Sequence, residues 1–379
     1  MTFKALNLLM PIISSEQLSN SKRLLFISPF ALGDFLYFKT FLIALKHQHP
    51  HIEIDIWLDD NRCNTDAWRL SRSKILQQWM QAEGTFNQSY GCTDSTIARD
   101  SQIEQANQRN YDIIVCHSPG SKANQFSDIA RKISPKAFIV SSVSKAPYRG
   151  LLNFVLFRNS DKVYQLDTDS LPTNHHITDR FMKVMNSIFD LQLSKEQMMP
   201  NLVVPDQTTT DSKEWLADKF PTTNGKLFFL NHLSTNTKKD WQLTQLFSLI
   251  SSLEQTDNGH RYIINVTPEN FEEVKTAAHT FSQENNIQLV VFTVDKHFFE
   301  LPSLIALSDF VITVDTAILH FAFAAKRPLL AMMRQKKPYW APPESATSHV
   351  MYATEGKGHV SDISVDTVFN KYLNMSSHA

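Results

Sequence analysis

Asp34 is the residue of this sequence best placed to do chemistry. It stands where an apolar run, residues 23–28, gives way to a segment with apolar residues at helical spacing, residues 34–47. Ligands of open α/β sheets bind where strands end and pass into helices. A carboxylate there can act as a general base, or it can cap the helix by accepting backbone N–H groups. The residues alone leave both interpretations open.

Two junctions in the second half of the chain combine hydroxyls, cations and an acid, which suits a charged ligand. Their polar residues are Ser234, Thr235, Lys238, Lys239, Asp315, Thr316 and His320. Simpler explanations exist: lysines are usually solvated, an Asp or Thr can be a cap, and a histidine among apolar residues can belong to the core. The free N–H groups of a helix that begins near residue 316 would nevertheless favour an anion.

Short acidic, histidine and cysteine patterns elsewhere predict no metal site. Asp167 and Asp169 form an Asp-x-Asp pattern in a polar stretch, which we interpret as a surface loop. The pairs 59–60 (Asp-Asp) and 175–176 (His-His) lack the context of metal ligands. The three cysteines are odd in number and widely spaced, which predicts free thiols in a reducing compartment.

Composition limits the class of protein. The chain has 379 residues, of which 42% are hydrophobic and 20% charged, so it should fold into two domains. A formal net charge of -1 gives no reason to expect a nucleic-acid partner. The chain has only 9 glycines and contains neither of the common glycine-rich phosphate-binding motifs. Any phosphate site must therefore be built from other groups.

The sequence predicts residence in the cytoplasm. No apolar run approaches the length of a membrane span. Residues 5–13 are apolar but short, and no clear cleavage site follows them, so they make a poor signal peptide. Peripheral contact with a membrane stays open.

Apolar runs alternate with helical patterns along most of the chain, which predicts an α/β fold with parallel sheets. Predicted strands lie at residues 23–28, 52–58, 111–116, 137–141, 227–231, 261–266, 288–292, 310–314 and 328–332. Predicted helices include residues 34–47, 171–195, 243–253, 271–284, 301–307 and 316–325. A turn-rich stretch at 195–210 divides the chain into predicted domains 1–200 and 201–379. We expect a ligand site in the cleft between their strand ends.

Three segments in the same order resemble glycosyltransferase family nine, the ADP-heptose:lipopolysaccharide heptosyltransferases. They are residues 28–58 with the turn Ala-Leu-Gly-Asp, 227–250 with a Ser-Thr loop and Lys-x-Trp, and 304–332 with Asp-Thr-x-x-x-His. The resemblance implies the GT-B arrangement: two Rossmann-like domains whose parallel sheets face a central cleft. It also implies an N-terminal acceptor domain and a C-terminal nucleotide-sugar domain, with the C-terminal tail packing back on the first.

The resemblance further implies a metal-independent enzyme that transfers a sugar with inversion. Asp34 would be the base, and Lys239, or Lys238 if the register differs by one, would meet the donor diphosphate. The other implied donor-binding residues are Ser234, Thr235, Trp241, Glu269 at the ribose, Asp315, Thr316, Ala317 and His320. No cofactor is implied beyond the nucleotide sugar, for which ADP-heptose is favoured.

The implied acceptor is a lipid-linked saccharide of the lipopolysaccharide or lipooligosaccharide core, met at the inner membrane surface. Lys145, Arg149 and Arg158 lie among apolar residues and could contact its phosphates, since a guanidinium donates two hydrogen bonds at once. The same segment could equally be a partly buried helix with long charged side chains at its ends.

Two departures from the family pattern keep other functions open. Ala317 replaces a glycine, and residues 333–338 (MRQKKP) replace a loop rich in Gly and Pro. One alternative is an enzyme of the same fold with another nucleotide sugar or a protein acceptor. The other is a non-catalytic scaffold whose donor site has degraded.

Overall fold

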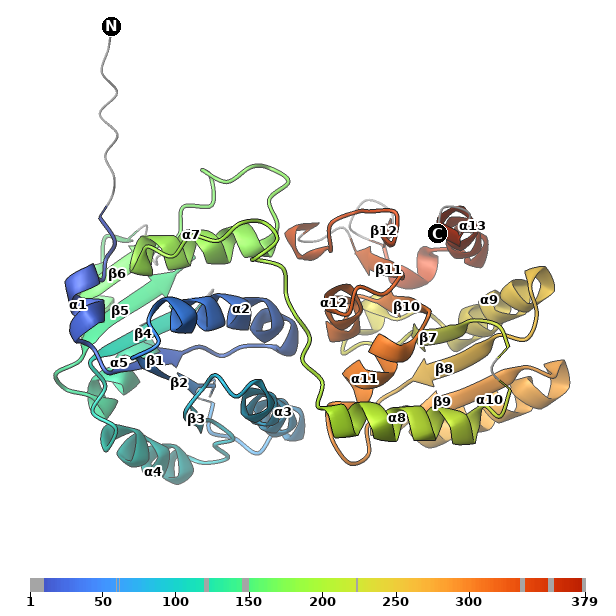
Figure 1. The fold of residues 1–379 in the computed structure, drawn as a ribbon, viewed down its shortest axis with the longest axis horizontal. Coiled ribbons are helices and arrows are strands. Elements are labelled where there is room, and N and C mark those ends of the chain that lie inside the picture. Colours follow the sequence, from blue (N-terminus) through green and yellow to red (C-terminus); the bar gives the residue numbers. More distant parts are fainter. Residues whose placement is uncertain are drawn as a thin grey trace, which may run out of the picture. The chain divides into compact units, whose positions relative to one another are not determined.

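The computed structural model describes residues 10–58, 60, 62–118, 123–144, 150–222, 224–334, 338–353 and 358–376. The chain forms two compact units, Met1–Pro200 and Asn201–Ala379 (Figure 1). Each contains one six-stranded sheet in which every neighbouring pair of strands is parallel. The α/β prediction is therefore confirmed. Within the described part of the chain, no helix is both long and apolar enough to cross a membrane.

The first unit holds a sheet in the order β3-β2-β1-β4-β5-β6. Its strands are β1 (Arg23–Ile27), β2 (Glu53–Trp57), β3 (Ser89–Tyr90), β4 (Ile113–Ser118), β5 (Phe138–Val143) and β6 (Lys162–Gln165). Its helices are α1 (Ser15–Asn20), α2 (Leu32–Gln48), α3 (Ala67–Glu83), α4 (Thr96–Asn107), α5 (Ala123–Ile133), α6 (Asn153–Leu156) and α7 (Ile177–Phe189).

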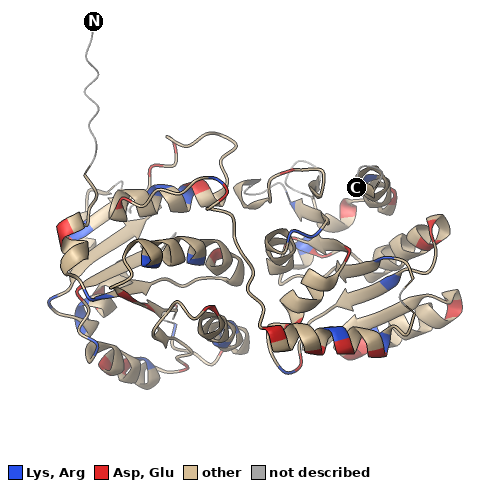
Figure 2. Cartoon of the chain, in the orientation of Figure 1, with Lys and Arg blue, Asp and Glu red and all other residues tan. Residues whose placement is uncertain are grey.

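Helices cover both faces of this sheet, which explains why its central strands are apolar throughout. On one face, Phe26 of β1 contacts Phe38 of α2 and Phe189 of α7. On the other face, Leu25 and Ile27 belong to a core cluster with side chains of α4 and α5. Charged residues accordingly belong mostly to helices and loops (Figure 2).

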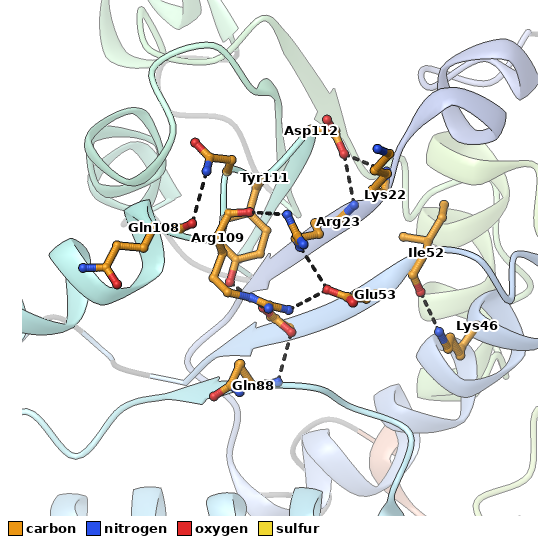
Figure 3. Close-up of polar contacts among 12 residues, drawn as sticks. Lys22, Arg23, Lys46, Ile52, Glu53, Gln88, Gln108, Arg109, Tyr111 and Asp112 are labelled. Atoms are coloured by element: carbon orange, nitrogen blue, oxygen red, sulfur yellow. Dashed lines mark hydrogen bonds and ion pairs between the residues drawn. The ribbon is translucent and has the colours of Figure 1, made fainter.

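A polar network fastens the amino-terminal ends of β1, β2 and β4 together (Figure 3). Arg23 and Arg109 both pair with Glu53, at 2.9 and 2.7 Å. Arg109 also reaches the fully buried Asp55, whose carboxylate accepts the hydroxyl hydrogen of Tyr111 at 2.6 Å. Burial raises the pKa of Asp55, against the opposing effect of these partners. These charged groups pair with one another and hold the amino-terminal edge of the sheet together. Asp34 follows the carboxyl end of β1 and therefore lies at the opposite edge.

The second unit repeats the plan with the strand order β12-β11-β10-β7-β8-β9. Its strands are β7 (Leu227–Asn231), β8 (Arg261–Asn265), β9 (Gln288–Phe292), β10 (Phe310–Val314), β11 (Leu329–Arg334) and β12 (Ser348–Ala353). Its helices are α8 (Asp206–Lys219), α9 (Leu243–Thr256), α10 (Phe271–Asn285), α11 (Glu300–Leu307), α12 (Ala317–Ala324) and α13 (Val365–Ser376). Short 3₁₀ turns are η2 (Thr237–Lys239), η3 (Pro268–Asn270), η4 (Pro338–Trp340) and η6 (Val360–Asp362).

Two predictions about helices need correction. The helix predicted at 171–195 is only α7, because His176 caps its start and Asp190 adopts a left-handed conformation at its end. The turn-rich stretch at 195–210 contains the first residues of α8, which begins directly after Pro205. Helix α13 itself contributes to the second core, where Tyr372 packs on Phe228 and Phe310.

Candidate functional site

Asp34 lies at the topological switch point of the first sheet. The chain leaves β1 toward β2 on one side, and β4 lies on the other side, so the loops diverge here and open the edge where ligands bind. Asp34 is the third residue of α2, whereas the N-cap position that the sequence suggested is held by Ala31. Its Oδ2 accepts the backbone N–H of Ala31 at 3.2 Å. The half-buried carboxylate therefore supports the helix start and stands at the switch point.

A buried histidine faces the same helix from the other side of the switch point. His117, near the end of β4, stacks on Phe38 of α2 with ring centroids 5.1 Å apart and an angle of 13°. Its Nδ1 lies 3.2 Å from the Ser142 hydroxyl. Burial lowers its pKa to about 4, so the ring is neutral at physiological pH. Sequence reasoning missed His117, although a histidine that ends an apolar strand was the available signal.

Of the three candidate acceptor-binding residues, the structure describes only Arg158. Lys145 and Arg149 lie outside the described residues. Arg158 is exposed, two residues beyond the single helical turn of α6.

The second unit has its own switch point between β7 and β10, and the loop after β7 is held there by its own polar groups. Asp240 Oδ1 accepts both the backbone N–H of Ser234 at 2.7 Å and its hydroxyl at 2.8 Å. Asn236 accepts the N–H of Lys238 at 3.0 Å and thereby starts η2. Ser234 thus shapes the loop, while Thr235 is exposed at its tip.

Lys239 is the lysine that reaches the neighbouring strand end. Its Nζ lies 2.6 Å from Oδ2 of Asp315, which follows β10, and both side chains are partly exposed. Lys238 is exposed on the same turn. The fold therefore brings two of the candidate segments together and selects Lys239 over Lys238 as the partner of Asp315.

Trp241 corrects the prediction of a direct donor contact. Its indole is fully buried in the core of the second unit, and its Nε1–H donates to the carbonyl of Ile363 at 2.9 Å. Its backbone N–H donates to the carbonyl of His232 at 2.9 Å. An indole enclosed in this way anchors the loop after β7 and is not available to a ligand.

The start of α12 is built as the sequence indicated. Thr316 is the N-cap, and its Oγ1 accepts the N–H of Ile318 at 3.3 Å. Ala317 is the first helical residue. His320 is buried one turn later, with its ring 6.0 Å from that of Trp340. Glu269 is exposed on η3, after β8, where a hydrogen bond from Thr267 lowers its pKa.

An amide network that the sequence did not reveal connects these segments. Asn231, buried at the end of β7, has its Nδ2 at 3.1 Å from Thr313 Oγ1, 3.3 Å from Thr316 Oγ1 and 3.2 Å from the carbonyl of Leu233. Its Oδ1 accepts an N–H of Asn265 at 3.1 Å. Asn231 thereby joins the loop after β7, the cap of α12 and the end of β8.

The patterns considered for metal binding have structural roles. Asp167 accepts the N–H of Asp169 within a turn, and its other oxygen lies 3.6 Å from Lys183. His176 caps α7. Asp60 pairs with Arg62 and Arg72, and Asp59 lies outside the described residues. Among the residues that the structure describes, no group of three or more His, Cys, Asp or Glu side chains is arranged to hold a metal ion.

Known structures share this fold at low sequence identity. A glycosyltransferase family 9 protein from Veillonella parvula matches with a TM-score of 0.72 and 16% identity, over 94% of this chain and 98% of that one. The ADP-heptose LPS heptosyltransferase II of E. coli matches with a TM-score of 0.68 and 18% identity, over 94% and 100%. The E. coli heptosyltransferase WaaC with ADP gives 0.61 and 16%, over 94% and 99%.

Two further comparisons concern the sequence itself. No curated protein matches it. The model of glycosyltransferase family 9 (heptosyltransferase) matches residues 152–368, which is more than half of the chain. This protein therefore belongs to glycosyltransferase family 9, the heptosyltransferase family, and is built from the two Rossmann-like units of a GT-B enzyme.

Proposed function

We propose that this glycosyltransferase moves a heptose, or a related sugar, from a nucleoside diphosphate donor to a lipopolysaccharide or lipooligosaccharide core acceptor, with inversion and without a metal. ADP-heptose is the favoured donor, because one solved structure of this fold is named an ADP-heptose LPS heptosyltransferase and another is described with ADP. The observation that carries the proposal is the convergence of Lys239, Asp315 and the start of α12 at one switch point.

In the proposed reaction, Asp34 accepts the proton of an acceptor hydroxyl as that oxygen attacks the anomeric carbon of the donor sugar. The bond between this carbon and the diphosphate oxygen breaks, and the nucleoside diphosphate leaves with the electron pair. A base needs to be within hydrogen-bond reach of the hydroxyl, and the first turn of a helix at a strand end suits this task. The first unit thus supplies the base and the acceptor contacts, among them Lys145, Arg149 and Arg158.

The second unit would hold the leaving group. The diphosphate gains negative charge as the bond breaks, and a cation placed in advance stabilises that charge. Lys239 meets this requirement because Asp315 orders its ammonium group beside the α12 N-terminus, where Thr316 and Ala317 begin the helix. Thr235 and Glu269, both exposed at the same sheet edge, are proposed to contact the phosphates and the ribose, and His320 to support the helix from within.

The membrane and the compartment belong to the same proposal. A lipid-linked acceptor would be met at the cytoplasmic face of the inner membrane, with the enzyme bound peripherally. Calorimetric titration with ADP, GDP and UDP tests the donor: ADP should bind at least tenfold more tightly than the other two. Equal affinities would favour another nucleotide sugar, and no binding would favour a scaffold.

Asp34→Asn tests the base, and Asp179→Asn is its matched control. Asp179 occupies the same third position of a helix, and its carboxylate accepts the N–H of the N-cap residue His176 at 2.9 Å. Asp34→Asn should keep ADP affinity within threefold but lower kcat by about 10²–10⁴, the usual contribution of a general base. Asp179→Asn should leave kcat nearly unchanged. Similar losses in both variants would mean that only helix capping matters.

Lys239→Met tests the diphosphate site, with Lys238→Met as the control on the same turn. Hydrogen bonds to charged groups contribute about 1.5–3 kcal/mol, so the loss of Lys239 should raise the Kd for ADP about 10- to 100-fold. Lys238 is exposed, and its variant should change the Kd by less than threefold. The reverse ranking would mean that Lys238 is the diphosphate ligand.

A further inference from the structure

A cluster of large apolar side chains is exposed around α6. Leu151 is 78% exposed, Leu152 40%, Phe154 76% and Val155 52%, all within five consecutive residues. Single exposed apolar residues are normal on soluble proteins, whereas a contiguous apolar patch marks a surface that binds something. We call residues 151–155 the apolar tip.

The tip is an ordered part of the fold. Residues 152–157 close a helical turn, with the N–H groups of Leu156 and Phe157 donating to the carbonyls of Leu152 and Asn153, both at 2.9 Å. Phe157 is buried against Val143 at the end of β5. Phe157 and the partly buried Leu156 thus anchor the turn on its inner side, while the apolar side chains of residues 151, 152, 154 and 155 stay exposed.

The charge around the tip indicates what it meets. Along the sequence, no acid lies between Asp128 and Asp161, while six cations do: Arg131, Lys132, Lys136, Lys145, Arg149 and Arg158. Arg131 pairs with Asp161 at 3.0 Å, whereas Lys132 and Lys136 are exposed. Arg158, directly after the anchor Phe157, is exposed. Apolar side chains flanked by cations suit an anionic lipid surface, in which the apolar groups enter the acyl boundary and the cations meet the head groups.

We propose that the apolar tip is the membrane-docking element of this enzyme and inserts Leu151 and Phe154 into an anionic lipid surface. The inference rests on the proposed function insofar as a lipid-linked acceptor explains why the enzyme must dock. It identifies the segment that carries the contact, which the proposed function leaves unspecified. Docking itself requires no acceptor and no donor, so it can be tested without enzyme activity.

The experiment is sedimentation of the full-length protein with vesicles of phosphatidylcholine alone, or of phosphatidylcholine mixed with phosphatidylglycerol. Wild type should bind the anionic vesicles, and binding should weaken as salt is raised. Leu151→Ser/Phe154→Ser should lower the partition coefficient at least about tenfold, since burial of each large apolar side chain contributes a factor of that order. Arg158→Gln should weaken binding to vesicles that contain phosphatidylglycerol and leave any binding to pure phosphatidylcholine vesicles unchanged.

Ile97→Ser is the matched control, because Ile97 is a large apolar residue that is 81% exposed on α4. It should bind vesicles as wild type does. The thermal midpoint and ADP affinity of the double variant should be unchanged, which verifies that it is folded.

Three outcomes would overturn the proposal. Wild type could fail to bind either vesicle, or the double variant could bind as well as wild type. Alternatively, wild type could prove to be a dimer that the double variant dissociates without vesicles, which would assign the tip to self-association. Failure of the proposed transferase activity would look different: vesicle binding would persist while no donor was consumed. If the transferase activity and the membrane docking are both real, the double variant should lose turnover of an acceptor embedded in vesicles. It should keep its turnover of a short, soluble acceptor.

Discussion

Asn231→Ala tests whether the amide network at the β7 and β10 strand ends holds the candidate donor site together. The Asn231 amide is buried, and its two hydrogens are shared among Thr313, Thr316 and the carbonyl of Leu233, while its oxygen accepts from Asn265. The substitution removes about three hydrogen bonds, each worth about 1 kcal/mol net. It also leaves the Asn265 amide buried with one partner fewer. We therefore expect a loss of about 3 kcal/mol in the free energy of unfolding of the second unit.

The loss is measured by thermal unfolding of the full-length protein. For a unit of this size, about 3 kcal/mol corresponds to a fall of about 6–12 °C in the midpoint of the second unit's transition. Asn285→Ala is the control, because Asn285 is exposed on α10 and its amide donates to the carbonyl of Phe281 in the same helix. Its effect should stay within about 0.5 kcal/mol, as is usual for surface substitutions.

Nucleotide affinity provides the second readout for Asn231. The amide fixes the cap of α12 relative to the loop that carries Lys239, so its loss should weaken ADP binding even below the unfolding transition. A variant that unfolds within 1 kcal/mol of wild type and binds ADP normally would refute the reasoning. Loss of stability with normal ADP affinity would limit Asn231 to a structural role.

Two further predictions concern the first unit. Lys39→Met should lower the free energy of unfolding, measured with urea, by about 3–5 kcal/mol, because it removes the ammonium group that lies 2.6 Å from the buried carboxylate of Glu83. The double variant Lys39→Met/Glu83→Gln should recover most of this loss, because no buried charge is then left unpaired. Equal losses in the two variants would contradict the ion-pair argument. Burial lowers the pKa of His117 to about 4 in the folded protein, whereas an unfolded histidine has a pKa of about 6.5. Below pH 6.5 the unfolded chain therefore takes up a proton that the folded protein excludes, so the free energy of unfolding declines as the pH falls toward 4. The control variant is His117→Phe, which keeps a ring stacked on Phe38 but cannot take up a proton. When the pH is lowered from about 7 to about 5, the free energy of unfolding should fall by about 2 kcal/mol less in this variant than in wild type. Equal falls would show that the folded protein does not hold His117 neutral.

The sequence predicted the layered α/β plan because this plan leaves a local signal. Strands covered on both faces, such as β4 and β10, are continuous apolar runs, and helices such as α2 and α9 repeat their apolar residues at helical spacing. Strands that lack this signal escaped notice. β6 and β12 lie at sheet edges, where partly exposed strands carry mixed residues.

Candidate residues at strand ends were also accessible from the sequence, because a strand followed by a helix places its turn at the carboxyl edge of a parallel sheet. Asp34, Thr316 and Glu269 were found in this way or through the family resemblance. The burial of Trp241 was not, since an aromatic residue before a helix can face either a ligand or the core. Only the packing of residues 360–363 against the loop after β7 decided between the two.

The sequence by itself determined most of the central strands, several of the helices and some of the polar residues that end them, because periodicity and caps depend on neighbours along the chain. Tertiary structure alone decided that Lys239 pairs with Asp315, that Asn231 joins three strand ends, and that the apolar residues 151–155 stay uncovered. These are properties of groups distant in sequence, whose distances and exposure depend on how the strands align and what packs over them.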